Sequence, residues 1–193
     1  MSGAGPAESR GEQANAAIVI RAAGADDLPA IARIYGHHVA NGLASFELEP
    51  PPVEEITRRH ADIVGKGYPY IVAERAGTVA GYAYASAYRA RPAYRFAVEN
   101  SVYVDAGLKR SGVGRTLLLA LIAECERRGY RQMIAVIGDS ANAGSVGVHR
   151  TLGFTHVGVF RSCGWKFGKW LDIVLMEKPL GEGDTTPPEP AAG

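Results

Sequence analysis

Two consecutive segments decide the fold of this chain: Glu99-Asn100-Ser101-Val102-Tyr103-Val104 and Lys109-Arg110-Ser111-Gly112-Val113-Gly114. The first is rich in β-branched and aromatic residues, which predicts a strand. The second is a glycine loop, and the largely apolar run 115–125 after it predicts a helix. A strand, a glycine loop and a helix N-terminus in succession form an anion site, because unpaired N–H groups of the first turn point at the ligand and glycine lets it approach. The stretch therefore predicts a pyrophosphate site.

The spacing of this loop excludes two common nucleotide motifs. A P-loop requires Gly-x-x-x-x-Gly-Lys-Ser/Thr, which Arg115-Thr116 does not complete. A dinucleotide fingerprint requires Gly-x-Gly-x-x-Gly near the first strand of a βαβ unit, whereas this loop lies in mid-chain. The loop instead has the spacing basic-x-x-Gly-x-Gly, formed by Lys109, Gly112 and Gly114. On the loop alone, a glycine-rich turn before an ordinary helix stays an alternative.

The composition is typical of a single globular domain. The chain has 193 residues, of which 47% are hydrophobic and 21% charged, and its net charge is +1. It has no basic block, which argues against nucleic acid or an anionic membrane as the main partner. No apolar run approaches the roughly 18 residues of a membrane span, and the N-terminus lacks a signal-peptide core, so we expect a cytoplasmic protein. Cys125 and Cys163 have no metal-ligand spacing, and we expect no metal site.

The order of the expected elements indicates one α/β domain with a mixed sheet and helices on its faces. We expect helices from about 26 through His37 and His38, and at 53–65, 115–129 and 142–153, and strands at 18–21, 70–74, 79–84, 99–104, 133–137, 154–160 and 170–176. This β-α-α-β-β-β-α-β-α-β-β order excludes a TIM barrel and a strictly doubly wound sheet. Segments 1–16 and 181–193 have the composition of disordered tails, which leaves 17–180 as the domain.

Two motifs of the chain resemble the GCN5-related N-acetyltransferases (GNAT). The 109–114 loop is similar to their Gln/Arg-x-x-Gly-x-Gly/Ala segment, which holds the acetyl-CoA pyrophosphate; Lys109 departs from it and lacks the planar fork of arginine. Segment 142–154 is similar to Asn-x-x-Ala/Ser-x-x-x-Tyr-x-x-Leu-Gly-Phe, with His149 in place of tyrosine. The two motifs have the family's order and separation. The resemblance implies the GNAT fold, in which the fourth strand and the helix after the glycine loop splay to admit the pantetheine arm.

The resemblance narrows to the branch that acetylates phosphinothricin and methionine sulfone or sulfoximine. Segments 89–104, 145–149 and 164–172 carry it, and the similarity covers about residues 18–178. It implies acetyl-CoA as co-substrate and a homodimer. The cofactor contacts that it implies are Val102, Tyr103, Val104, Lys109, Arg110, Ser111, Gly112, Val113, Gly114, Arg115, Asn142 and Ser145.

Glu99 and His149 are the expected catalytic residues. An ammonium has no lone pair and attacks a thioester only after losing a proton, and a carboxylate on a largely apolar strand has its pKa raised toward the working range of a base. The family resemblance assigns this role to Glu99, through a water; a solvent-facing or arginine-paired carboxylate is the alternative. His149 is expected to protonate the departing thiolate or to assist Glu99, and a buried core histidine is the alternative. The backbone N–H groups of 102–104 are expected to polarise the thioester carbonyl.

Arg89 and Arg91 precede the catalytic strand and predict an acceptor with an acidic or strongly accepting group, because a guanidinium fork fits a carboxylate, phosphinate or sulfonyl group. A solvated surface pair is the alternative for these arginines. The expected acceptor-site residues are Phe46, Arg89, Ala90, Arg91, Tyr94, Glu99, Asn100 and Ser101. His37 and His38 are expected at the surface or at a dimer contact.

The sequence leaves two other functions open. One is acetylation of a peptide or protein N-terminus, or of another small amine. The other is a non-catalytic acyl-CoA-binding module, although the joint presence of Glu99 and His149 argues against it.

Overall fold

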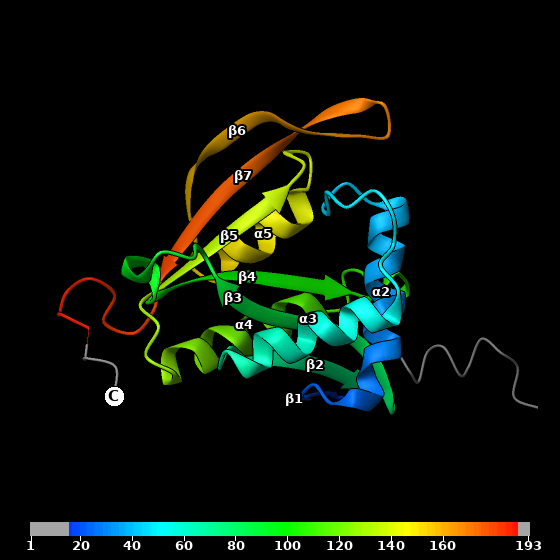
Figure 1. Cartoon of the computed structure of the whole chain (residues 1–193), viewed down its shortest axis with the longest axis horizontal. Helices are drawn as coiled ribbons and strands as arrows, with labels where there is room; N and C mark the ends of the chain where they lie inside the picture. Colours follow the sequence, from blue (N-terminus) through cyan, green and yellow to red (C-terminus); the bar gives the residue numbers. More distant parts are fainter. Residues whose placement is uncertain (1–15, 189–193) are drawn as a thin grey trace, which may run out of the picture.

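The computed structural model describes residues 16–188, and their strands form one seven-stranded mixed sheet in the order β1-β2-β3-β4-β5-β7-β6 (Figure 1). Neighbouring strands are antiparallel except β4 and β5, which are parallel. The expected mixed α/β architecture is confirmed. The strands are β1 (Ile18–Ala22), β2 (Tyr70–Arg75), β3 (Thr78–Ala87), β4 (Ala97–Val104), β5 (Gln132–Gly138), β6 (Thr155–Lys166) and β7 (Lys169–Pro179).

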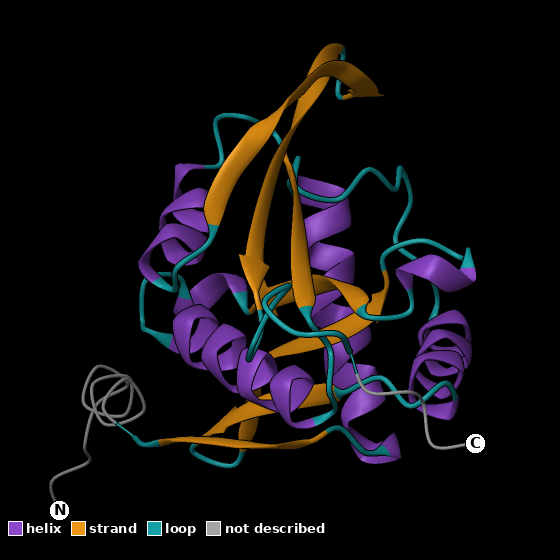
Figure 2. Cartoon of the chain, turned by 90° about the vertical axis from the view of Figure 1, so that its left-hand side faces the viewer, coloured by secondary structure: helices purple, strands orange, loops and turns teal. Residues whose placement is uncertain are grey.

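Helices cover both faces of the sheet (Figure 2). On one face, α2 (Leu28–Asn41) and α3 (Val53–Gly65) pack against tyrosines of the central strands. On the other face, α4 (Val113–Arg127) packs on the alanines of β3, and α5 (Ala143–Thr151) lies beside β5. Because side chains alternate along a strand, β3 turns Tyr82 and Tyr84 toward α2 and α3, and Ala83 and Ala85 toward α4. Three short 3₁₀ turns complete the described elements: η1 (Ala25–Asp27), η2 (Pro92–Tyr94) and η3 (Ala106–Leu108).

The divergence of β4 from β5 is the feature of the sheet that positions the site. These strands pair only from Ala97 opposite Gln132 to Asn100 opposite Ala135. Beyond that point β4 continues to Val104 paired with β3 alone, and β5 continues paired with β7. The backbone of residues 101–104 therefore faces the side from which β5 has departed, next to the start of α4. This is the splay that the family resemblance implies for the pantetheine arm.

Several strands extend beyond the expected ranges, whereas helix α2, which ends at Asn41, includes His37 and His38 as expected. Strands β6 and β7 are longer than expected, because their register shifts between Phe160 and Gly164, where Ser162 has a φ of +54°. Such a bulge interrupts the alternating pattern by which a strand is recognised, and the chain resumes pairing beyond it.

The predicted C-terminal tail begins with ordered contacts. Residues 181–184 form turns, and the guanidinium of Arg131 donates to Thr186 Oγ1 at 3.0 Å and to the Pro187 carbonyl at 3.2 Å. The rest of that tail, 189–193, and residues 1–15 of the N-terminal one lie outside the described residues. Across 16–188, every helix is too short or too polar to cross a bilayer.

Candidate active site

The glycine loop before α4 has the conformation of an anion site. Gly112 is the N-cap of α4 and has a φ of +86°, in the left-handed region that favours glycine. The first hydrogen bond of the helix runs from the Thr116 N–H to the Gly112 carbonyl at 3.0 Å. The N–H groups of Val113, Gly114 and Arg115 consequently lie outside the helical ladder and are available to a ligand.

The two glycines serve different purposes. A Cβ at Gly112 would have no heavy atom within 4 Å, so the space beside the loop is open. A Cβ at Gly114 would lie 3.3 Å from Cγ2 of Val104, because α4 starts close against the end of β4. Lys109, Arg110 and Arg115 are exposed around the loop. An open, cationic helix N-terminus beside the diverging strands fits the pyrophosphate of acetyl-CoA.

The second motif forms the start of α5. Asn142 caps this helix, and its Oδ1 accepts a hydrogen bond from the Ser145 N–H at 3.2 Å. Ser145 in turn accepts at its carbonyl from Nδ1 of His149, at 2.8 Å. The motif therefore builds a short chain of contacts from the helix N-terminus to the buried histidine.

His149 is hydrogen-bonded at both ring nitrogens. Its Nε2 lies 3.0 Å from Oδ1 of Asn100, whose Nδ2 donates to the Ile134 carbonyl at 3.0 Å. Carbonyl oxygens only accept, so Nδ1 carries a hydrogen and the Asn100 amide must turn its oxygen toward the ring. Hydrogen bonding at Nε2 then requires a second ring hydrogen, which favours the imidazolium. Burial acts in the opposite direction and lowers the pKa of His149.

Glu99 lies on the opposite face of β4 from Asn100. In the β3–β4 register, Glu99 is opposite Ser86 and Ser101 is opposite Tyr84, and directly opposed residues share a face of the sheet. The Glu99 side chain is partly buried, and burial raises the pKa of its carboxyl group. The strand thus presents a carboxyl group of raised pKa toward α2 and α3, just before the point where β5 diverges.

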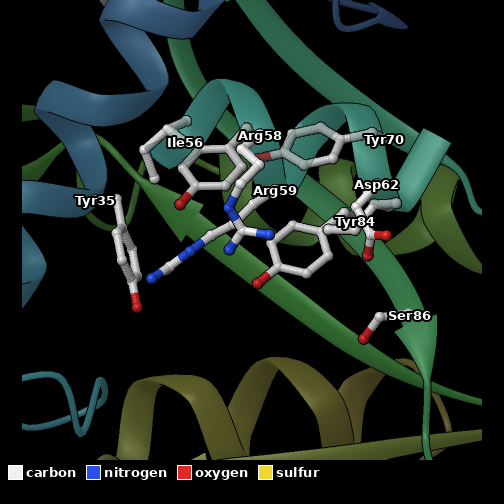
Figure 3. Close-up of a pocket in the computed structure, with 10 residues that line it drawn as sticks. Tyr35, Ile56, Arg58, Arg59, Asp62, Tyr70, Tyr84 and Ser86 are labelled. Atoms are coloured by element: carbon white, nitrogen blue, oxygen red, sulfur yellow. The ribbon is translucent and has the colours of Figure 1, made fainter. Parts of the chain in front are cut away.

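A cavity of about 230 Å³ lies on the same face, between α2, α3 and the sheet (Figure 3). Because Ser86 is directly opposite Glu99 in the sheet, the cavity adjoins the expected base. Its lining combines aromatic rings with two arginines, and consists of Tyr35, Ile56, Arg58, Arg59, Asp62, Ile63, Tyr70, Tyr82, Tyr84 and Ser86.

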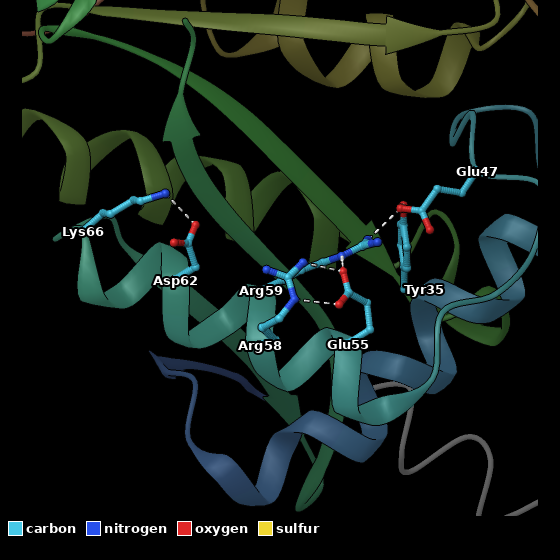
Figure 4. Close-up of polar contacts among 7 residues, drawn as sticks. All are labelled: Tyr35, Glu47, Glu55, Arg58, Arg59, Asp62 and Lys66. Atoms are coloured by element: carbon cyan, nitrogen blue, oxygen red, sulfur yellow. Dashed lines mark hydrogen bonds and ion pairs between the residues drawn. The ribbon is translucent and has the colours of Figure 1, made fainter. Parts of the chain in front are cut away.

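Carboxylates fix the guanidinium of Arg59 at the wall of this cavity (Figure 4). Its Nη1 donates to Oε1 of Glu47 at 2.6 Å, and its Nε donates to Oε1 of Glu55 at 2.7 Å. The hydroxyl of Tyr35 donates to the same Glu47 oxygen at 2.8 Å. Glu47, in the loop between α2 and α3, therefore contacts both Arg59 and Tyr35, while Glu55 holds Arg59 from within α3.

The sequence of this chain matches a known protein family over most of its length. The model of the acetyltransferase (GNAT) domain matches residues 20–175. The chain belongs to the GNAT family. The GNAT identity suggested by the two motifs is confirmed, and with it an acetyl-CoA-dependent N-acetyltransferase activity.

Relatives within the GNAT family agree over most of the chain. It is 53% identical to the phosphinothricin N-acetyltransferase of Alcaligenes faecalis, over 92% of this chain and 90% of the relative. It is 38% identical to the L-methionine sulfoximine/L-methionine sulfone acetyltransferase of Pseudomonas aeruginosa, over 87% of this chain and 98% of the relative. Its structure matches the phosphinothricin acetyltransferase of Sinorhizobium meliloti in complex with AcCoA, with a TM-score of 0.87 and 46% identity, over 90% of this chain and 94% of that one.

None of the acceptor-site residues expected in this GNAT domain is among those that line the cavity, and Glu99 adjoins it only as the strand neighbour of Ser86. Arg89, Ala90, Arg91 and Tyr94 lie exposed in the loop before β4, and the Arg89 guanidinium is 5.1 Å from the centre of the Tyr88 ring. The side chain of Asn100 points toward His149, so only the backbone of Asn100 can contact a ligand near Glu99.

Phe46 packs away from the cavity lining, against the backbone of Gly138 and Gly164. The sequence analysis missed Arg59, because this residue lies among polar residues of α3, a pattern that is typical of a solvent-exposed helix face. Only the loop carrying Glu47, twelve residues away in sequence, shows that this arginine lines a cavity.

His38 is partly buried and makes contacts that the surface expectation did not include. Its Nε2 donates to the Val104 carbonyl at 2.8 Å, and its ring packs 5.6 Å from that of Tyr103. His38 therefore supports the end of β4 beside the pyrophosphate loop, whereas His37 is exposed. A contact across 66 residues leaves no local signal in the sequence. Among residues 16–188, no group of three His, Cys, Asp or Glu side chains is arranged to hold a metal ion.

Proposed function

We propose that this protein acetylates the α-amine of a small amino acid or analogue, of the phosphinothricin, methionine sulfone or methionine sulfoximine type. The names of the relatives support this substrate class. The observation that carries the proposal is the placement of Glu99, which is partly buried and lies opposite the cavity residue Ser86. An acceptor in that cavity has Glu99 beside its amine. The diverging strands, where the thioester is expected, lie on the far side of Glu99.

Glu99 acts as the general base. Bound acetyl-CoA supplies a thioester. The acceptor attacks as the neutral amine, and as its nitrogen forms a bond to the acetyl carbon it passes one proton to the Glu99 carboxylate, through a water. The C–S bond then breaks, and the thiolate leaves with the electron pair. The raised pKa of Glu99 suits it to accept this proton near neutral pH.

Backbone and His149 stabilise the charge that develops. The N–H groups of Val102–Val104 that face the departed β5 polarise the thioester carbonyl. His149 is the proposed source of the proton for the thiolate. Because Asn100 engages its Nε2, that proton is released only when the hydrogen bond between them opens.

Arg89 and Arg91 are proposed to hold the acidic or sulfonyl end of the acceptor. Both guanidinium groups are exposed in the loop directly before β4, within a segment shared with the resembled branch. A guanidinium group that is solvated in the free protein binds an anionic group more strongly once the acceptor excludes water from it.

A peptide or protein N-terminus is the second candidate acceptor. The chain is 39% identical to the ribosomal-protein-alanine N-acetyltransferase of Brucella melitensis, with a TM-score of 0.82 over 84% of this chain and 99% of that one. The two candidates differ in the size of acceptor that the cavity beside Glu99 must accept.

An acceptor panel separates these candidates. Thiol release from acetyl-CoA is measured with phosphinothricin, methionine sulfone, methionine sulfoximine and a peptide with a free N-terminus, and the product is identified by mass. We expect the small analogues to be acetylated on the α-amine with the higher kcat/KM. A peptide that is the only good acceptor contradicts the proposed substrate class.

A homodimer and a cytoplasmic location complete the proposal. Large apolar side chains stand exposed along the β6–β7 hairpin, which lies at the edge of the sheet, and this supports a second copy as the partner. They are Val157, Val159, Phe160, Trp165, Phe167 and Trp170.

A further inference from the structure

Lys166, at the end of β6, is a buried cation that the mechanism above does not use. The residue is 2% exposed, and its Nζ donates to the carbonyls of Val39 and Ser45, each at 2.8 Å. Val39 lies in the last turn of α2, where carbonyl oxygens have no partner within the helix and the dipole favours a cation. The ammonium therefore joins the C-terminal hairpin to a loop 121 residues away in sequence.

The segment that Lys166 grips, residues 44–47, is here called the strap. The strap lies directly on the backbone of two glycines. A Cβ at Gly138 would lie 2.6 Å from the Ala44 carbonyl oxygen, and a Cβ at Gly164 would collide with the ring of Phe46. The strands beneath thus leave room for the strap only because both positions lack a side chain.

The other side of the strap holds two walls of the cavity. The hydroxyl of Tyr35 is 3.0 Å from Oγ of Ser45. It donates to Glu47, which also accepts from Arg59 (Figure 4). Tyr35 and Arg59 both line the cavity beside Glu99 (Figure 3). A shift of the strap therefore moves Glu47 and, with it, the two side chains that Glu47 orients.

We propose that Lys166 is a positioning residue for the acceptor: it fixes the strap, and through Ser45 and Glu47 it sets the cavity walls Tyr35 and Arg59. Lys166 itself touches neither substrate nor reacting atoms. The inference rests on the proposed function in one respect, namely that the acceptor occupies the cavity beside Glu99.

The test is Lys166→Met, which keeps the length of the side chain and removes its hydrogen-bond donors. Lys169→Met is the matched control, because Lys169 is directly opposite Lys166 in the same hairpin and is exposed. For Lys166→Met we expect the KM for phosphinothricin and for methionine sulfone to rise about tenfold or more, with kcat and CoA affinity changed by less than about threefold. Lys169→Met should leave all of these values unchanged.

A local readout separates positioning from general loss of stability. In Lys166→Met, amide hydrogen exchange should accelerate in the strap and at the C-terminal turn of α2, and stay unchanged in α4. Tyr35→Phe removes a second fixing point of the strap. Its effect on acceptor KM should combine non-additively with that of Lys166→Met, because the two residues hold the same segment.

Gly164→Ala covers the case in which Lys166→Met does not fold. It leaves Lys166 in place and displaces Phe46, and the same rise in acceptor KM is expected with CoA affinity intact. The inference is overturned if the folded Lys166→Met or Gly164→Ala protein has the acceptor KM of Lys169→Met, or loses CoA affinity and kcat with no change in that KM. Failure of the proposed base is distinguishable, since it appears as full turnover in Glu99→Gln whatever the Lys166 variants do.

Discussion

At the scale of single residues, Glu99 lies where its charge costs stability. Burial raises the pKa of its carboxyl group, so the folded chain binds this proton more tightly than the unfolded chain does. Ionisation therefore favours the unfolded chain, and this contribution to stability is lost as pH rises through the folded-state pKa. The proposed catalytic role of Glu99 accounts for a charge that costs stability at this position.

Glu99→Gln should consequently raise the melting temperature at pH 7, because glutamine keeps the shape and carries no charge to desolvate. The gain should shrink toward zero below about pH 4, where the carboxyl group is protonated in both states. Thermal melts at several pH values measure it, with the exposed Glu49→Gln as the control. A Glu99→Gln protein that is equally or less stable than the parent at pH 7 contradicts the burial argument.

Arg91→Ala and Arg89→Ala test the acceptor contact. Because the guanidinium would hold the bound acceptor equally in ground and transition states, either change should raise the acceptor KM by roughly tens to hundreds of fold and alter kcat less. Arg95→Ala, in the same loop and stacked on Phe96, is the control. The KM is measured by steady-state thiol release. An unchanged KM in both test variants rules out the predicted anion contact without contradicting the acetyltransferase activity.

Sequence reasoning found residues whose chemistry conflicts with their local pattern and missed those whose role depends on distant contacts. Glu99 was identifiable because a carboxylate on an apolar strand has no packing reason to be there. Arg59 and His38 were not identifiable, because Arg59 is placed by its contact with Glu47 and His38 by its contact with the Val104 carbonyl. Lys166 belongs to this second group, with both of its partners more than 120 residues away.

At the scale of elements, the glycine loop and α4 form the most predictable unit of the site. Strand, loop and helix are contiguous, so the unit is specified by local spacing and by the φ of +86° that only glycine adopts readily at 112. The bulge in β6 shows the opposite case, because the shift at 160–164 is set by pairing with β7 and not by local propensity.

Gly112→Asp should abolish CoA binding, because it adds a carboxylate and backbone strain where the pyrophosphate is expected. Gly129→Asp is a matched control, since Gly129 follows the other end of α4 with a φ of +80° and equally open space. Calorimetry on the folded proteins should show CoA binding in the control alone. Unchanged CoA affinity in a folded Gly112→Asp protein contradicts the assignment of the loop.

At the scale of the whole molecule, the sheet ends in an edge strand with an unusual surface. Trp165 and Trp170 pack edge to face at 5.3 Å and are 56% and 63% exposed. Composition and periodicity could not predict this surface, because it forms only when the β6–β7 hairpin brings the two tryptophans together. An apolar cluster on a sheet edge is a site for association.

Replacing both tryptophans with serine should shift the protein from dimer toward monomer, as measured by light scattering coupled to size exclusion. The exposed Val19→Ser, on the strand at the other edge of the sheet, is the control and should stay dimeric. A parent protein that is monomeric at every concentration, or a double variant that remains fully dimeric, contradicts this interface.

The pH dependence of kcat/KM, compared between the parent protein and Glu99→Gln with the best acceptor of the panel, tests the central claim most directly. We predict a parent profile with an acidic limb, displaced above the ordinary carboxyl range by the burial of Glu99. In Glu99→Gln, kcat should fall roughly 10²–10⁴-fold and the limb should disappear, with CoA affinity unchanged. A Glu99→Gln protein that keeps near-parental turnover and the same acidic limb would contradict the account and move the base elsewhere, with His149 as the first alternative.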